Sequence, residues 1–275
     1  MRRAQFQRAI QRLAGRLLPR AAVLLGAGLI AFVPAQFADA AALQVSPIRL
    51  DLSADRPAAA LTLHNDGTTP INAQVRVFGW SQALDEDHLE RSDRVVASPP
   101  IVQIAPGADQ TVRILRVGNT PVTEEETYRL LIDEIPNDQT AQTTGVRVQL
   151  RYSVPVFVGA PEGKPPVVDF ALEHAAPPAS AASGAALMLR AANHATGHAQ
   201  LSQVRLEWPN GQSTQVSSGL LGYALPHATR RWPIAGAPAG AASATLHAVV
   251  NGEAFTTRIA VEPASGAAVS AVPAR

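Results

Sequence analysis

Cysteine is absent from this sequence of 275 residues. Its absence excludes a cysteine nucleophile, metal sites built from thiolates, and catalytic disulfide exchange. Stabilising disulfides are excluded as well, but a chain of this length can bury a sufficient hydrophobic core without them. The composition is therefore compatible with export to an oxidising compartment, although it does not by itself indicate one.

Aromatic residues and lysine are scarce. Phe, Trp and Tyr together make up 5% of the sequence, and its three tryptophans, Trp80, Trp208 and Trp232, are scattered along it. A carbohydrate-binding module favours exposed aromatic side chains gathered on one surface, so this distribution does not indicate one. Lysine occurs once, at Lys164.

The sequence also lacks the motifs of common active sites. It contains no GxSxG turn, phosphate-binding loop or dinucleotide-binding fingerprint. His194 and His198 have the spacing of two metal ligands on one helix face, but the segment contains Gly197 and predicts a turn between strands. The acidic runs at 85–87 and 123–127 predict solvated loops. We therefore predict no enzyme activity, no metal site, no cofactor and no small-molecule substrate.

The first 42 residues have the layout of a secretory signal peptide. Six arginines precede an apolar run from Ala21 to Ala35, and small residues follow at 38–42. We predict cleavage after Ala40 or Ala42. The apolar run is shorter than the roughly 20 residues that a membrane-spanning helix needs, so an uncleaved N-terminal anchor is the less favoured alternative.

Removal of this leader changes the net charge of the chain. The leader holds six of the 23 basic residues and one of the 22 acidic residues, which leaves 17 against 21 and a net charge of −4. A chain with this balance has no basic surface field to attract nucleic acid or an anionic membrane. We predict neither as a partner.

The rest of the sequence consists of short apolar segments separated by turn residues such as Asn65-Asp66-Gly67 and Pro106-Gly107. No convincing helical periodicity lies between them, and this pattern is typical of antiparallel β-sandwiches. We predict strands within residues 43–52, 59–67, 71–80, 99–115, 128–136 and 145–158, and then within 167–175, 186–195, 199–211, 214–226, 228–234 and 244–262.

The composition shifts near Gly159, where "GAPEGKPP" interrupts the strand pattern and predicts a linker. We therefore predict two β-sandwich domains, at residues 43–160 and 161–262, because each half has the usual size of this architecture. Residues 263–275 are predicted to form a flexible tail.

One segment alternates with unusual regularity. In "GVRVQLRYSVPVFV", residues 145–158, Val146, Val148, Leu150 and Tyr152 fall on one face of a strand, and arginine, glutamine and serine fall on the other. Most amphipathic strands turn their apolar face to their own core. Alternation alone leaves open whether this row fills the core of the chain or binds another protein.

Several segments, in this order and spacing, resemble the periplasmic pilus (fimbrial) assembly chaperones. They are "LQVSPIRLDL", "PPIVQIAPGADQTVRIL", "ETYRLLIDEIP" and "VRVQLRYSVPVFV", followed by "NHATGHAQLSQVRL" and "LLGYALPHATRRWPI". The resemblance covers roughly Leu43 to Glu262 and is nearest to the branch whose corresponding strand reads "RYSVPVFV". It implies a non-enzymatic chaperone with two immunoglobulin-like domains arranged in an L.

The resemblance also implies a mechanism. Chaperones of this family lend an edge strand to a pilus subunit that lacks its last strand, and they deliver the subunit to an outer-membrane usher. The donor strand falls on residues 145–152, with Val146, Val148, Leu150 and Tyr152 as the side chains that enter the subunit. The implied partners are pilus, fimbrial or spore-coat-like subunits and the usher, and the implied location is the periplasm. An exposed apolar edge also raises the possibility of a dimer that caps itself.

Two basic residues of the family hold the terminal carboxylate of the subunit, and the first of them falls on Arg49. The second is a lysine in the family, but Pro155 stands at its position here. Arg151 and Arg113 are the candidates that the sequence offers in its place. Two alternatives to the chaperone stay open: an exported β-sandwich structural subunit or adhesin, and a carbohydrate-binding module.

Overall fold

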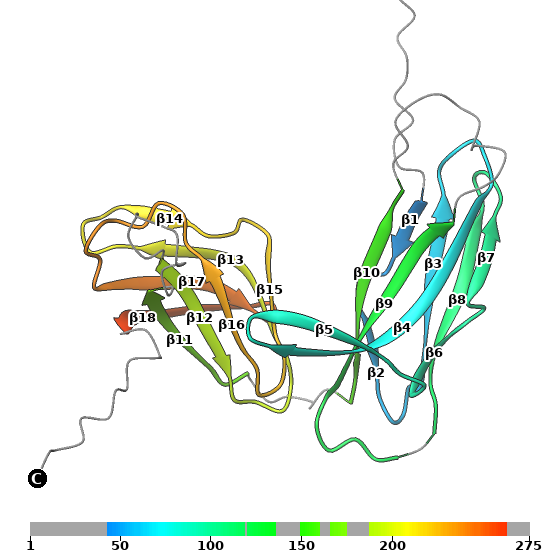
Figure 1. The fold of residues 1–275 in the computed structure, drawn as a ribbon, viewed down its shortest axis with the longest axis horizontal. Helices are drawn as coiled ribbons and strands as arrows, with labels where there is room; N and C mark the ends of the chain where they lie inside the picture. Colours follow the sequence, from blue (N-terminus) through cyan, green and yellow to red (C-terminus); the bar gives the residue numbers. More distant parts are fainter. Residues whose placement is uncertain (1–42, 119, 136–148, 160–165, 175–186, 263–275) are drawn as a thin grey trace, which may run out of the picture. The chain divides into compact units, whose positions relative to one another are not determined.

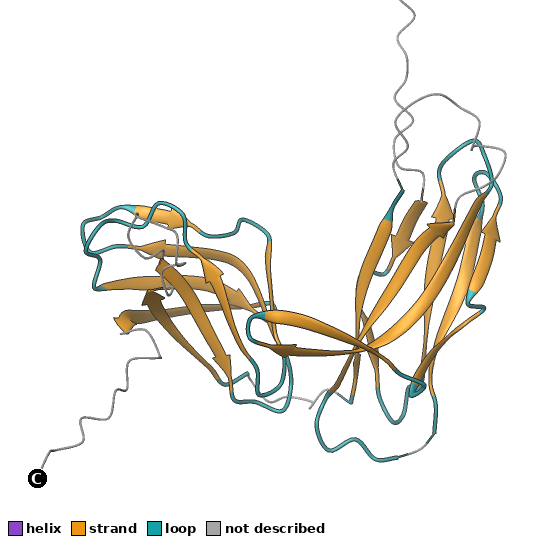
Figure 2. Cartoon of the chain, in the orientation of Figure 1, coloured by secondary structure: helices purple, strands orange, loops and turns teal. Residues whose placement is uncertain are grey.

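The computed structural model describes residues 43–118, 120–135, 149–159, 166–174 and 187–262. All regular structure in these ranges is β-strand (Figures 1 and 2). Within them, no helix could cross a membrane. The first ten strands are β1 (Leu43–Ser46), β2 (Leu50–Leu52), β3 (Ala58–Asn65), β4 (Ile71–Ala83), β5 (Glu86–Arg91), β6 (Val95–Ser98), β7 (Ile101–Ile104), β8 (Asp109–Arg116), β9 (Glu126–Ile135) and β10 (Arg151–Val158).

These ten strands form the first sandwich. One sheet has the order β1-β3-β8-β6, and the other has the order β2-β10-β9-β4-β5, with β7 also paired to β4. Alternate residues of each strand face the space between the sheets, as Leu61 and Leu63 of β3 and Leu130 and Ile132 of β9 illustrate. The alternation of apolar and polar residues in the sequence therefore separates the side chains that face the core from those that face outward.

The second sandwich contains the remaining eight strands. They are β11 (Val168–His174), β12 (Leu187–Asn193), β13 (Ala199–Glu207), β14 (Ser213–Gln215), β15 (Leu220–Ala224), β16 (Thr229–Pro233), β17 (Ser243–Val250) and β18 (Glu253–Glu262). Their pairing order is β14-β13-β17-β18-β11-β12-β16, with β15 paired to β13. Leu189, Leu201, Leu206 and Leu246 lie fully buried in its core.

A buried asparagine ends a strand in each sandwich. Asn65 donates from Nδ2 to the carbonyls of Thr69 and Ile104, and its Oδ1 accepts from the amide of Gly67. Asn193 ends β12 in the same way, with Oδ1 accepting from the Ala195 amide. Each side chain thereby satisfies backbone groups at a turn that would otherwise be buried without partners.

The two sandwiches belong to one compact unit, residues 41–275, and share a small aromatic cluster. Phe157 of β10 is fully buried, and its ring stacks on the ring of His198 with 3.7 Å between centroids. Trp80 and Tyr223 pack edge to face with centroids 5.6 Å apart. Aromatic contacts of this kind stabilise beyond the burial of their area.

The acidic run at 123–127 departs from the prediction of a solvated loop. Glu126 and Thr127 begin β9, and Glu125 is 6% exposed. The Glu125 carboxylate accepts a hydrogen bond from the backbone amide of His198 at 2.9 Å and lies 2.8 Å from Nδ1 of the same histidine. A buried carboxylate is tolerated here because these donors replace water.

The all-β fold with two sandwich domains is confirmed. The predicted signal peptide, the predicted linker and the predicted tail lie mostly or wholly outside the described residues, so the boundaries at 42, 160 and 262 stay predictions.

Candidate functional site

Strand β10 is incompletely paired. It runs antiparallel to β9 along its whole length, but on its other side it pairs with β2 only from Val156 to Val158. Among the described residues, no strand pairs with that side of Arg151–Pro155. We call this stretch the open edge. Unpaired strand edges are templates for adding another strand.

The hydrogen-bond pattern shows which residues present their backbone to the open edge. The amide of Glu134 donates to the carbonyl of Leu150, so the even-numbered residues of β10 bond with β9. The odd-numbered residues face the other way, as the bond from the Gly159 amide to the Leu52 carbonyl confirms. Arg151 and Ser153 therefore offer both an N–H and a C=O at the open edge.

Pro155 is the third residue that faces the open edge. Proline has no N–H to donate, which is why it is tolerated on an edge and disfavoured inside a sheet. Immediately after it, β2 occupies the side of β10, beginning with the pair of Val156 and Leu50. The open edge therefore ends at Pro155.

The predicted apolar row lies only partly within the described residues. Val146 and Val148 lie outside them, and β10 begins at Arg151. Leu150 and Tyr152 are half-buried, and Tyr152 packs against the first core with its hydroxyl donating to the Leu43 carbonyl. Within β10, Tyr152 is thus the member of the row that lies on the core-facing side along the open edge.

Arg49 lies where the open edge ends, because it directly precedes β2. Its guanidinium donates from Nε and one terminal nitrogen to the carboxylate of Asp51, with the shortest contact at 2.7 Å. Its central carbon lies 5.2 Å from the ring centroid of Phe157. The side chain is 36% exposed, and its second terminal nitrogen makes no hydrogen bond to the residues that the structure describes.

The two other predicted arginines lie away from Arg49. Arg113 is exposed on β8, in the opposite sheet. Arg151 lies at the far end of the open edge and is paired with Asp133 of β9. Arg76 also donates to Asp133, at 2.5 Å. Burial raises the pKa of Asp133, but the hydrogen bonds from Arg151 and Arg76 outweigh it and hold that pKa below its ordinary value.

Replacing Asp133 with asparagine is expected to lower the free energy of unfolding at pH 7 by about 1 kcal/mol, because water screens both largely exposed arginines. A carboxylate with a lowered pKa stabilises the fold above its unfolded pKa of about 4, and this contribution disappears as the pH falls through the folded value. Urea unfolding at pH 7 and near pH 2 should therefore show a difference between the two proteins that vanishes in acid. A difference that persists in acid would contradict this assignment.

Sequence reasoning missed Arg129. It lies on β9 directly opposite Pro155, and its guanidinium stacks on the Trp80 ring at 3.6 Å from the centroid. Burial lowers its pKa, and among the described residues it makes no ion pair with a carboxylate. Burial also raises the pKa of Tyr223, against the opposing effect of Arg129 and Arg49. Both cations thus act on one aromatic cluster near the end of the open edge.

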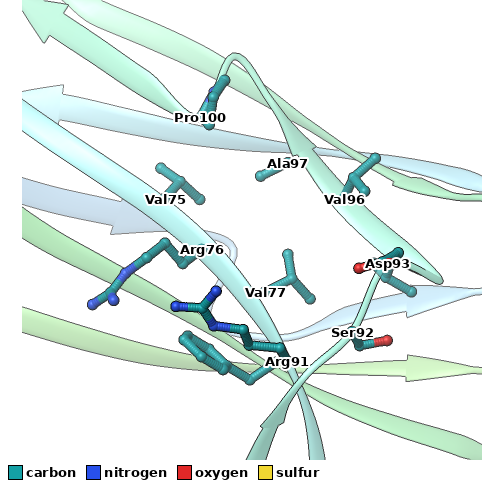
Figure 3. A pocket seen from close by; sticks show the side chains of 11 residues that line it. Val75, Arg76, Val77, Arg91, Ser92, Asp93, Val96, Ala97 and Pro100 are labelled. Carbon is teal, nitrogen blue, oxygen red and sulfur yellow. The ribbon is translucent and has the colours of Figure 1, made fainter.

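A separate hollow of about 400 Å³ is lined by residues of β4 and of β6, which belongs to the opposite sheet (Figure 3). Val75, Val77 and Ala97 surround it, and Arg76 and Arg91 lie at its border. It occurs where β4 changes its partner from β7 to β5. It contains none of the predicted site residues, and no group of metal ligands occurs in the described part of the chain.

Comparison with known proteins gives one family match. Residues 42–164 match the family described as pili and flagellar-assembly chaperone, PapD N-terminal domain. No curated protein matches the sequence.

Solved structures match about four fifths of the chain. One is from the CsuC–CsuE chaperone–tip adhesion subunit pre-assembly complex of the archaic chaperone-usher Csu pili of Acinetobacter baumannii, with a TM-score of 0.59, 23% identity, and coverage of 81% of this chain and 100% of that chain. The YadV chaperone matches with a TM-score of 0.56 and 16% identity, over 79% of this chain and 100% of that one. A chain of the Salmonella enterica SafA pilin–SafB chaperone complex matches with a TM-score of 0.53 and 15% identity, over 79% of this chain and 95% of that one. At these identities the likeness shows a shared fold.

Proposed function

We propose that the protein is a periplasmic chaperone for subunits of a surface fibre, because residues 42–164, which hold the first sandwich, match the N-terminal domain of the pili and flagellar-assembly chaperones. In this role it binds a subunit that lacks one strand, completes the sheet of the subunit with β10, and passes the subunit to an outer-membrane usher. The reaction is strand addition and needs no cofactor.

The open edge of β10 is the observation that carries this proposal. Backbone groups of Arg151 and Ser153 point away from β9 and have no partner among the described residues. Such groups bind an incoming strand through main-chain hydrogen bonds, which demand little of its sequence. Selectivity among subunits would come from the apolar side chains of the row, since alternate side chains of an added strand fill pockets of its partner. These are the side chains of Val146, Val148, Leu150 and Tyr152.

The direction of the bound strand follows from the position of Arg49. Because β10 runs toward Arg49, a strand whose carboxyl end reaches this cation must run parallel to β10. Guanidinium groups bind carboxylates in bidentate geometry, and partial burial strengthens the contact. We propose that Arg49 binds the terminal carboxylate of the subunit and that Arg129, rather than Arg151 or Arg113, is the second cation of this site.

The alternatives find less support in the described residues. Trp80 and Trp208 are 4% and 2% exposed and serve the cores, so they offer no aromatic platform for a sugar. A structural subunit would itself need a strand from another chain, whereas each sandwich here has a core of fully buried residues supplied by its own described strands. A self-capping dimer through the open edge stays a proposal, and a monomer mass independent of concentration would exclude it.

Replacing Ser153 with proline tests the proposed function. The substitution removes the last N–H of the open edge but leaves the hydrogen bonds to β9 intact, because Ser153 faces away from β9. We expect capture of a fibre subunit by the tagged mature chain, in the periplasm of its own host, to fall at least tenfold, since a hydrogen bond is lost and the ring obstructs the added strand.

Ser153→Ala is the matched control, because it keeps the N–H and should capture the subunit normally. Mass spectrometry identifies the captured protein, and circular dichroism verifies the fold of each variant. If the proline and alanine variants captured equal amounts of the subunit, β10 would not be the strand that binds it. Absence of any fibre subunit from the wild-type capture would refute the chaperone role itself.

A further inference from the structure

The hollow along β4 lies at a break in strand pairing. Strand β7 pairs with β4 only as far as Gln74, and β5 pairs with the same side of β4 from Phe78 onward. The residues of β4 between them, Val75 to Val77, have no neighbouring strand on this side among the described residues. At the rise of a β-strand, the break is about 10 Å long. The hollow in Figure 3 therefore opens at a place where β4 has no partner.

Backbone groups of β4 face this break. The Val75 amide donates to the Pro100 carbonyl at 2.8 Å, which shows that the odd-numbered residues of β4 turn their backbone toward β7. Val77 is the next of these residues, and no described backbone group bonds to its N–H or its C=O on this side. The Val75 carbonyl receives no bond from Pro100, because proline has no N–H. One backbone donor and two acceptors therefore point toward the hollow.

The hollow also has apolar walls and a cation at its border. The volume of about 400 Å³ falls within the range of about 300–1,000 Å³ that small-molecule sites have. At the border, Arg91 makes no ion pair with a described residue, whereas Arg76 pairs with Asp133. An apolar hollow with an unpaired cation and free backbone groups suits a small organic anion. Its apolar walls are formed by Val75, Val77, Val95, Val96, Ala97 and Pro100.

We propose that this hollow binds a small N-acyl amino acid, which combines an apolar acyl chain, a secondary amide and a carboxylate. The acyl chain packs against the valines of the walls. The amide N–H donates to the Val77 carbonyl, and the carboxylate accepts from the Val77 amide and from the Arg91 guanidinium. This binding is separate from the proposed chaperone function, since β9 lies between β4 and the open edge of β10.

The class of ligand follows from the backbone geometry. In an antiparallel sheet, one residue exchanges both an N–H and a C=O bond with the residue opposite. An N-acyl amino acid has an N–H and a carboxylate on one residue, so it can form this pair with Val77. A fatty acid has no N–H for the Val77 carbonyl. A longer peptide cannot extend the pairing, because β7 and β5 already occupy β4 on either side of the break.

Two charged residues of the hollow act on an anion with opposite signs. A hydrogen bond from the Arg91 guanidinium to a carboxylate is roughly twice as strong as a bond between neutral groups. Asp93 also lines the hollow, beside Ser92, and its negative charge opposes an anion (Figure 3). Neither charge has a comparable effect on an uncharged analogue. The pair therefore provides a test in which two substitutions change the affinity in opposite directions.

The test compares three synthetic compounds by isothermal titration calorimetry with the mature protein. N-hexanoylglycine should bind with a dissociation constant below about 1 mM. N-hexanoylglycinamide lacks the charge and should bind at least about tenfold more weakly, because a charge-assisted hydrogen bond is lost. N-hexanoylsarcosine has a methyl group in place of the amide hydrogen and should bind at least about fivefold more weakly, because it cannot donate to the Val77 carbonyl.

Variants of the protein assign the site. Arg91→Gln should weaken the binding of N-hexanoylglycine at least about tenfold and leave the glycinamide unchanged. Asp93→Asn should strengthen the binding of N-hexanoylglycine at least about twofold, because it removes a like charge. Ala97→Leu fills the hollow and should abolish the binding of all three compounds. Arg205→Gln, on the second sandwich, is the control and should bind as the wild type does. Circular dichroism verifies the fold of each variant.

The outcomes separate this site from the open edge. No binding of N-hexanoylglycine to the wild type, equal binding of its amide, or unchanged binding by Arg91→Gln would each overturn the proposal. The Ser153→Pro variant should bind N-hexanoylglycine normally, because its substitution lies at the open edge of β10. A loss of binding in that variant would place the ligand at the open edge and overturn the assignment to the hollow. None of these results alters the capture of fibre subunits, which tests the chaperone function separately.

Discussion

Glu125→Ala is expected to lower the free energy of unfolding by about 3–5 kcal/mol, because it leaves one partner of a buried ionisable pair without the other. The Glu125 side chain is 1% exposed, and His198 is 5% exposed. Both carboxylate oxygens lie within 2.9 Å of Nδ1 of His198, and the backbone amide of His198 donates to the same group. Urea unfolding, followed by tryptophan fluorescence, measures the loss.

Two comparisons make this expectation specific. Glu124 forms a neighbouring but exposed pair with His227, at 3.4 Å, and Glu124→Ala should cost less than about 1 kcal/mol. Replacing both members of the buried pair, as in Glu125→Met with His198→Phe, should recover much of the loss, because apolar groups of similar volume need no hydrogen bonds. Equal losses of unfolding free energy for Glu124→Ala and Glu125→Ala would show that burial does not set the size of the effect.

Phe157→Ala is the second large expected effect, again about 3–5 kcal/mol. The Phe157 ring is fully buried between residues of both sandwiches, stacked on His198 and with its centroid 6.3 Å from that of Trp80. Alanine would leave a cavity that the paired strands around it cannot close, since Phe157 lies between β2 and β9.

Thermal unfolding by calorimetry measures this effect and also reports on the coupling of the sandwiches. We expect a lower melting temperature and a broader transition, because the cluster joins residues from both halves. Phe255→Ala is the matched control, since that ring is 36% exposed on the second sandwich and should cost much less. A loss for Phe157→Ala no larger than for Phe255→Ala would exclude the cluster as a major source of stability.

Local patterns predicted most of the strands, because a two-residue alternation is a direct signature of a half-buried sheet. They missed β5 and β6, and Glu86 and Asp87 begin the exposed strand β5 instead of forming the predicted loop. The buried state of Glu125 could not be predicted in this way. Its sequence neighbours are polar, and the donors that allow its burial come from His198, which is 73 residues away in the other sandwich. Pairing across such a distance leaves no signal in a local pattern.

The candidate site also depends on contacts between residues that lie far apart in the sequence, which a local pattern does not reveal. Arg49 and Pro155 were identified from motifs, but the place of Arg129 depends on the register between β9 and β10, which puts it opposite Pro155. Arg151 is a candidate in the sequence, and only the fold shows that Asp133 already pairs with it. The sequence thus indicated which strand is available, and the register showed which cations lie near its end.

The alternation along β10 also has an evolutionary consequence. The side chains of Val154 and Val156 are fixed by the core that they fill, whereas Arg151 and Ser153 are exposed and contribute their backbone to the open edge. Backbone groups are the same for nearly every amino acid, so substitutions at these two exposed positions can accumulate without loss of strand pairing. Lineages can therefore diverge along this strand while its mode of recognition persists, and proline is the substitution that purifying selection should remove.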